Sequence, residues 1–122
     1  MATAVIDGIT TRYEVIGNGV PLLMFPEGHR SETGELIEFH GGAFKVALSS
    51  GSSVAPIVVD GTWPIYRGFR VQPCPGRITI RILEPIAPEE AGGSAERLRL
   101  LAFERIQAEL ASIRGIVRQQ AV

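Results

Sequence analysis

A continuous apolar run at residues 20–25, VPLLMF, stops abruptly at Pro26 and constrains the fold more than any other feature of the chain. An unbroken apolar run that ends at proline and glycine predicts a buried strand of a largely parallel sheet, because such strands are covered on both faces. In open α/β sheets, ligands bind beyond the carboxyl ends of the strands. We therefore expect a ligand site in the residues that follow the run.

The residues after the run, EGHRS at 27–31, have the chemistry of an anion site. Arg30 carries a planar fork of donors that matches phosphate, and Gly28 leaves the main chain open to a ligand. Ser31 adds a hydroxyl, and Glu27 is expected to orient Arg30 or to accept a hydrogen bond from a substrate hydroxyl. We call Glu27, Gly28, Arg30 and Ser31 the anion clamp. An exposed ion pair between Glu27 and Arg30, with no binding role, is the alternative.

Four stretches carry a resemblance to a known family. Residues 25–31, FPEGHRS, closely resemble the FPEG-x-R-S signature of the glycerol-phosphate and lysophosphatidic-acid acyltransferases, and FHGGAF (39–44), VAPIVVDGT (54–62) and LEPI (83–86) follow in the family's order. The resemblance runs from about residue 19 to the C-terminus. It implies an α/β acyltransferase-like partial domain at residues 19–122, the family's C-terminal half, with a mixed, largely parallel sheet flanked by helices.

The same resemblance implies an activity in glycerophospholipid synthesis. The family moves an acyl group from a thioester on coenzyme A or acyl carrier protein to a hydroxyl of a glycerol-phosphate or lysophosphatidate acceptor, with no metal and no bound cofactor. By resemblance the anion clamp binds the acceptor phosphate and residues 39–44 line the acceptor site. His40, Lys45 and Arg67 are secondary candidates for phosphate contact.

The family's catalytic His and Asp belong to an N-H-x-x-x-x-D motif upstream of FPEG. The two histidines of this chain, His29 and His40, are followed five positions later by Gly34 and Lys45, so neither matches the motif. We therefore identify no catalytic residue, and we expect a truncated acyltransferase that lacks its catalytic base. His40 as a replacement base is a lesser alternative.

Two other functions stay open. One is a non-catalytic module that binds phosphorylated lipid. The other is a fragment of an α/β-hydrolase. Residues 1–18 contain two short apolar stretches, which predict a separate N-terminal pair of short strands, and YEVIGNGVPLLMF (13–25) resembles the opening strands of that fold. A hydrolase needs a G-x-S-x-G nucleophile elbow, which the 122 residues do not contain.

The composition indicates a cytoplasmic protein with peripheral membrane contact at most. No apolar stretch approaches the roughly 20 residues that span a bilayer, and the N-terminus lacks a signal-peptide pattern. A net charge of −1 offers no basic field for nucleic acid, and a single cysteine, Cys74, suits a reducing compartment. The aromatic and basic residues interleaved at 62–76 could touch a membrane interface or a nucleotide-bearing acyl donor.

Local patterns predict the remaining elements. A short helix follows Gly42 and ends at residues 50–51, and an apolar strand at 54–59 contains Pro56, which implies an edge or bulged position. Residues 77–83 alternate as a half-exposed strand. Ser94 is expected to cap a long helix whose apolar stripe faces the sheet; the stripe is Leu98, Ala102, Ile106, Leu110, Ile113 and Val117. Without the family's upstream half, one sheet face should lie bare, which predicts poor solubility or self-association.

Overall fold

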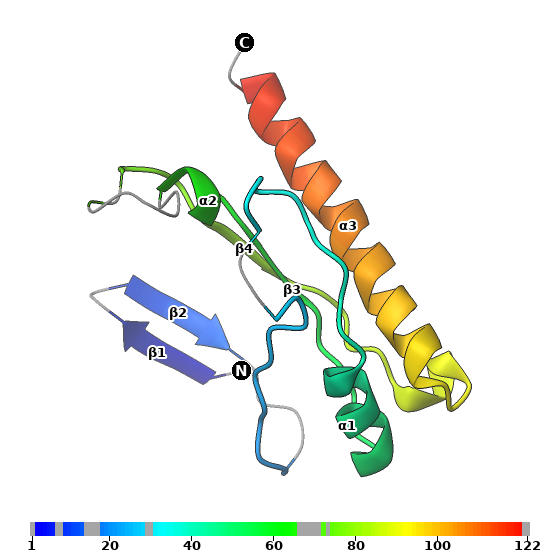
Figure 1. Cartoon of the computed structure of the whole chain (residues 1–122). Coiled ribbons are helices and arrows are strands. Elements are labelled where there is room, and N and C mark those ends of the chain that lie inside the picture. Colours follow the sequence, from blue (N-terminus) through cyan, green and yellow to red (C-terminus); the bar gives the residue numbers. More distant parts are fainter. Residues whose placement is uncertain are drawn as a thin grey trace.

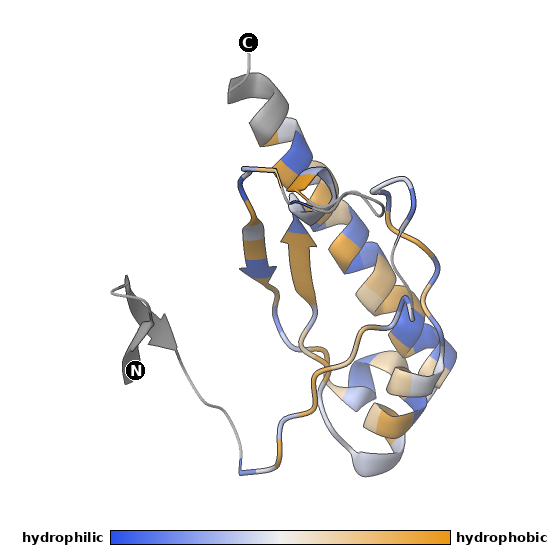
Figure 2. Cartoon of the chain, turned by 60° about the vertical axis from the view of Figure 1, so that its left-hand side comes forward, coloured by the Kyte–Doolittle hydropathy of each residue, from blue (hydrophilic) through white to orange (hydrophobic). Residues whose placement is uncertain are grey.

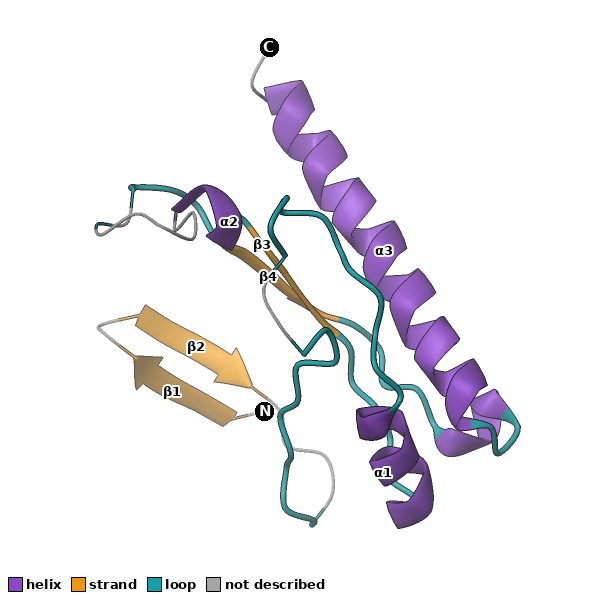
Figure 3. Cartoon of the chain, viewed as in Figure 1, coloured by secondary structure: helices purple, strands orange, loops and turns teal. Residues whose placement is uncertain are grey.

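A computed structural model describes the backbone of residues 2–6, 9–13, 18–28, 31–65, 72 and 74–120, and the side chains of 18–28, 31–65, 72 and 74–116. Along the chain the elements are β1 (Ala2–Ile6), β2 (Ile9–Tyr13), α1 (Gly42–Ser50), β3 (Ile57–Asp60), α2 (Thr62–Ile65), β4 (Thr79–Ile82), the 3₁₀ helix η1 (Pro88–Ala91) and α3 (Ala95–Gln120). Helix α3 runs along one side of the β3–β4 pair, and α1 lies near the N-terminal end of α3 (Figures 1 and 3).

Both sheets in the described part of the chain are antiparallel pairs. Strand β1 pairs with β2, and β3 pairs with β4 in a register that runs from Ile57 opposite Ile82 to Asp60 opposite Thr79. An antiparallel bridge between Val54 and Ile86 continues the second pair beyond Pro56, which cannot donate to a ladder. The mixed α/β class is therefore confirmed, whereas the largely parallel sheet is not found among the described strands.

Residues 20–25 do not form the buried strand that the sequence predicts. The side chain of Val20 is 96% exposed and that of Phe25 is 79% exposed, and the segment belongs to no strand. A strand buried on both faces requires neighbours at its edges and layers above and below it. No strand pairs with this run in the described structure, so its apolar side chains remain in solvent.

Helix α3 supplies four of the nine buried apolar residues in the described part of the chain, and they lie on the face that its periodicity predicts. These residues belong to two clusters; the first is Phe39, Phe44, Ile86, Ala91, Leu98 and Ala102, and the second is Val58, Leu110 and Ile113. The Ser94 hydroxyl accepts a hydrogen bond from the main-chain N–H of Arg97 at 3.3 Å, which confirms the predicted cap. The predicted stripe is confirmed except at Val117, whose side chain lies outside the described residues.

The short helix α1 also ends where the sequence predicts. Gly51 follows its last residue with a left-handed φ of 67°, and its N–H donates to the carbonyl of Leu48 at 3.2 Å. This is the common glycine end of a helix. None of the described helices is both long and apolar enough to cross a membrane.

The β3–β4 pair has one covered face and one bare face. Val58 is 1% exposed and lies on the α3 side, where Arg81 forms an ion pair with Glu109 of the helix. The opposite face carries aliphatic side chains that are 40–74% exposed, namely Ile57, Val59, Ile80 and Ile82. The alternation predicted for residues 77–83 is thus present, but its isoleucines lie on the open side. Figure 2 shows these apolar strands, and the expected bare sheet face is confirmed.

Candidate anion-binding site

The residues after the apolar run form a tight turn. The main-chain N–H of Gly28 donates to the carbonyl of Phe25 at 3.1 Å, and Gly28 has a φ of +72°, a conformation that favours glycine. Because this N–H is already used inside the turn, Gly28 serves the site by lacking a Cβ. The Gly28 N–H is therefore not free for the ligand contact that the sequence predicts at this position.

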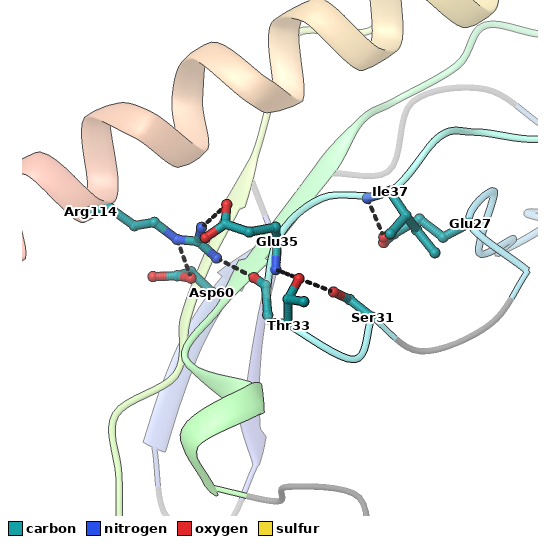
Figure 4. A network of polar contacts seen from close by, with 8 residues as sticks. Glu27, Ser31, Thr33, Glu35, Ile37, Asp60 and Arg114 are labelled. Carbon is teal, nitrogen blue, oxygen red and sulfur yellow. Dashed lines mark hydrogen bonds and ion pairs between the residues drawn. The ribbon is translucent and has the colours of Figure 1, made fainter.

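A second segment, residues 37–40, closes onto this turn. The N–H of His40 donates to the carbonyl of Pro26 at 2.7 Å, and the N–H of Ile37 donates to Glu27 Oε2 at 3.1 Å (Figure 4). These two bonds join the FPEG stretch to the FHGG stretch. In the described part of the chain, the Glu27 carboxylate thus accepts a main-chain N–H, and its predicted contact with Arg30 or a substrate hydroxyl stays a prediction.

His40 lies directly beside Gly28. A Cβ built on Gly28 would lie 2.9 Å from His40 Cδ2 and 3.1 Å from Nε2, so the imidazole occupies the space that a side chain would need. The His40 residue is exposed, which leaves its ring accessible to a ligand. The structure thus brings together Glu27, Gly28 and His40 of the predicted site.

The other predicted site residues fall into two groups, those that the structure describes and those that lie outside the described residues. Ser31 is partly buried, and its Oγ lies 3.4 Å from Thr33 Oγ1. Lys45 is exposed on α1 and lies on the solvated side of that helix, as favoured from the sequence. Arg30 and Arg67 lie outside the described residues, as does His29. Phe39 and Phe44, expected by resemblance to line the acceptor site, are 4% and 3% exposed, and their side chains belong to the core.

Two arginines of α3 contact residues between 34 and 39, and neither was predicted from the sequence. Arg114 contacts residues 34 and 35, and Arg99 donates to the carbonyl of Phe39 at 3.3 Å. Each directly follows a buried stripe residue, Leu98 or Ile113, so a position at the border of the apolar stripe was visible in the sequence. The segment that each arginine contacts could not be predicted from the sequence.

Arg99 also pairs with two carboxylates beside His40. It hydrogen-bonds to Glu96 and lies 3.6 Å from Glu38. The hydrogen bond to Arg99 lowers the pKa of Glu96 below its ordinary 4.5, and the same bond raises the pKa of Arg99. An open depression of about 450 Å³ lies here, lined by Glu38, Phe39, His40, Gly41, Glu96 and Arg99. Since its carboxylates outnumber its guanidinium, this depression is less suited to an anion than the turn beside it.

No group of three or more His, Cys, Asp or Glu side chains is placed to hold a metal ion in the described part of the chain. Among the predicted site residues that the structure describes, His40 carries ring nitrogens and Ser31 a hydroxyl. These are ligands for an oxyanion such as phosphate.

The sequence and the fold match one family. Its model, described as "Acyltransferase", matches residues 3–60, which include the FPEG turn, the FHGG segment and β3. This match supports the resemblance of the chain to the glycerol-phosphate and lysophosphatidic-acid acyltransferases. The match begins inside residues 1–18, so the predicted division of the chain at residue 18 stays a prediction.

Two relatives that match part of the chain share the name of one enzyme. The chain is 36% identical over 78 residues to a 1-acyl-sn-glycerol-3-phosphate acyltransferase of Cocos nucifera, across 62% of this chain and 25% of the relative. It is 41% identical over 71 residues to the enzyme of that name from Limnanthes douglasii, across 57% of this chain and 25% of the relative. The chain thus spans about a quarter of the length of these curated relatives.

A solved structure supports the same relationship. The 1-acyl-sn-glycerophosphate acyltransferase PlsC of Thermotoga maritima superposes with a TM-score of 0.68 and 29% identity, over 74% of this chain and 37% of that one. The acyltransferase prediction is confirmed at the level of the family. The alternative of an α/β-hydrolase fragment gains no support from these matches.

Proposed function

We propose that this chain forms the acceptor-binding part of a 1-acyl-glycerol-3-phosphate acyltransferase. Its ligand is the phosphate of a glycerol-phosphate or lysophosphatidate acceptor, whose hydroxyl receives an acyl group from a thioester on coenzyme A or acyl carrier protein. The observation that carries the proposal is the contact of His40 with the bare Cα of Gly28 in the turn closed by Pro26. It places a nitrogen-bearing ring beside the clamp residues that precede it in the chain.

The arrangement of Glu27 removes an objection to phosphate binding. A carboxylate facing a phosphate would repel it, but Glu27 Oε2 accepts the N–H of Ile37 at 3.1 Å. The carboxylate thus contributes by fixing the turn against residues 37–40. We assign the phosphate contacts to the Arg30 guanidinium and the Ser31 hydroxyl, with His40 as a contact whose charge depends on protonation.

A second candidate function is binding of phosphorylated lipid without turnover. The observation in its favour is that no histidine of the 122 residues has an aspartate five positions later. Acyl transfer requires a base for the acceptor hydroxyl, and a base must lie within hydrogen-bond reach of that proton. We assign no base among the described residues, so turnover distinguishes the two candidates.

The test is calorimetric titration of the folded chain with glycerol 3-phosphate and with lysophosphatidate. Arg30→Ala should abolish saturable binding. The control Arg105→Ala should leave binding unchanged, because Arg105 of α3 pairs with Glu90 of η1 and not with a residue of the turn. Absence of saturable binding by a folded wild-type chain would overturn the proposal. Acyl transfer from an acyl thioester, measured on the same samples, would favour the enzyme, and His40→Ala would then test the replacement base.

We also propose that the acceptor is taken from the cytoplasmic surface of a membrane, with no bound cofactor besides the thioester co-substrate. Lysophosphatidate is a lipid, and the exposed apolar side chains of Leu22, Leu23 and Phe25, at 69–79%, could enter a membrane interface. Co-sedimentation with phosphatidylcholine vesicles containing lysophosphatidate tests this. Equal sedimentation of wild type and a Leu23→Ser, Phe25→Ser double variant would contradict it.

A further inference from the structure

Arg114 joins three segments that are far apart in the sequence. Its Nε donates to Asp60 Oδ1 at 3.1 Å, at the end of β3. Its two terminal nitrogens donate to Glu35 Oε2 at 3.0 Å and to the Gly34 carbonyl at 2.7 Å (Figure 4). One guanidinium on α3 thereby fixes the loop at residues 31–38 against the end of β3.

The same loop is supported from a second side by α2. Trp63 Nε1 donates to the carbonyl of Glu32 at 3.2 Å. Gly34 has a φ of +81°, and a Cβ there would lie only 3.0 Å from the indole ring. The loop therefore lies between Trp63 and Arg114 with little freedom to shift.

This supported loop begins and ends at the anion clamp. Ser31 is its first residue, and Ile37, near its other end, donates to Glu27. A displacement of the loop would move the Ser31 hydroxyl and break the link that holds the Glu27 carboxylate. The positions of Glu27 and Ser31 in the clamp thus depend on contacts made at residues 34 and 35.

Arg114 is poorly suited to bind the phosphate itself. Its charge is balanced by Asp60 and Glu35, and its side chain is only 29% exposed. A guanidinium that already donates from all three nitrogens to protein oxygens has little to offer a further anion. A lysine at this position would retain the charge but would lose the planar fork that reaches three acceptors.

We propose that Arg114 is a positioning residue for the anion clamp. It acts through the loop at residues 31–38, and acceptor affinity depends on it without contact between Arg114 and the acceptor. The inference deepens the proposed function and rests on it for the binding measurement alone. The position of the loop can be tested without a ligand.

The first test is amide hydrogen exchange in the free chain, read at the Ile37 amide, which is hydrogen-bonded to Glu27. In Arg114→Gln and in Arg114→Lys this amide should exchange at least severalfold faster than in wild type. Arg105→Gln is the matched control, because it also removes one arginine and one ion pair from α3. Unchanged Ile37 exchange in both Arg114 variants would overturn the inference, whether or not the chain binds phosphate.

The second test is affinity for glycerol 3-phosphate in the same variants. Arg114→Gln and Arg114→Lys should each raise the Kd about tenfold, the scale at which residues linked through a contact network alter binding. Gly51→Ala is the control for lost stability, since Gly51 ends α1 with a φ of +67° and a Cβ there would meet nothing within 4 Å. It should leave the Kd unchanged.

The outcomes separate this inference from the proposed function. A wild-type chain that binds glycerol 3-phosphate with an affinity indifferent to Arg114 would overturn the inference and leave the proposed function standing. A wild-type chain that does not bind, in which Ile37 exchange still depends on Arg114, would overturn the proposed function. It would show Arg114 to be a positioning residue for the loop alone.

Discussion

Replacement of Gly28 by alanine tests the contact on which the site is built. Gly28 has a φ of +72°, and a new Cβ would lie 2.9 Å from Cδ2 and 3.1 Å from Nε2 of His40. Two separate costs follow. Alanine must adopt a left-handed backbone conformation, and the imidazole must move away from the methyl group.

The two costs can be estimated separately. The left-handed conformation costs an L-residue about 1–2 kcal/mol. Displacement of the exposed His40 ring from its rotamer adds about 0.5–1.5 kcal/mol. Gly51 supplies a matched reference, because its φ is +67° and a Cβ there would meet nothing within 4 Å. Gly51→Ala should therefore show the backbone cost alone, and Gly28→Ala should lose about 0.5–1.5 kcal/mol more.

The assay is urea unfolding followed by circular dichroism, with the m-value checked in every variant. The cycle is completed by His40→Ala and by the double variant. In the His40→Ala background the cost of Gly28→Ala should fall to that of Gly51→Ala, since the ring is gone. If Gly28→Ala costs the same with and without His40, the imidazole does not lie over Gly28 and the proposed site loses its central observation.

Three further predictions concern the core, the bare sheet face and pH. Leu98→Ala, at a fully buried position, should cost about 2–5 kcal/mol in urea unfolding, whereas Leu100→Ala, 43% exposed on the same helix, should cost about 1 kcal/mol or less; equal losses would contradict the packing of α3. Ile80→Thr should reduce self-association in sedimentation velocity, because Ile80 is 62% exposed on the bare face of β4; unchanged association would place the contact elsewhere. The bond from Arg99 lowers the pKa of Glu96, so its stabilisation is present above about pH 4.5 and is lost as the pH falls through the lower folded value. Glu96→Gln should remove that part of the acid dependence of unfolding, and an unchanged acid slope would refute the assignment.

Much of the helical structure could be read from the sequence because its causes are local. Ser94 caps α3 through a hydrogen bond three residues away, and Gly51 ends α1 with a left-handed backbone. The spacing of Leu98 and Ala102 identifies the face that is buried. Such signals lie within a few residues of the feature they specify.

Part of the anion clamp could be predicted because its residues also lie close together in the chain. Glu27, Gly28 and Ser31 are adjacent in the chain, so the sequence shows them as one group. A place for His40 near the phosphate was suggested by resemblance, whereas its position beside Gly28 came from the structure. The dependence of the loop on Arg114 had no local signal, because 80 residues separate this arginine from Gly34.

The sequence by itself indicated the acyltransferase resemblance, the two main helices and the residue types of the predicted anion site. Only the tertiary structure decided that residues 20–25 are exposed, that β3 and β4 pair antiparallel, and which face of that pair is covered. An apolar run indicates a tendency to be buried, but the run is buried only where other strands and helices of the fold cover it. Capping and periodicity act along the chain, whereas strand pairing and long-range ion pairs depend on which segments meet in space.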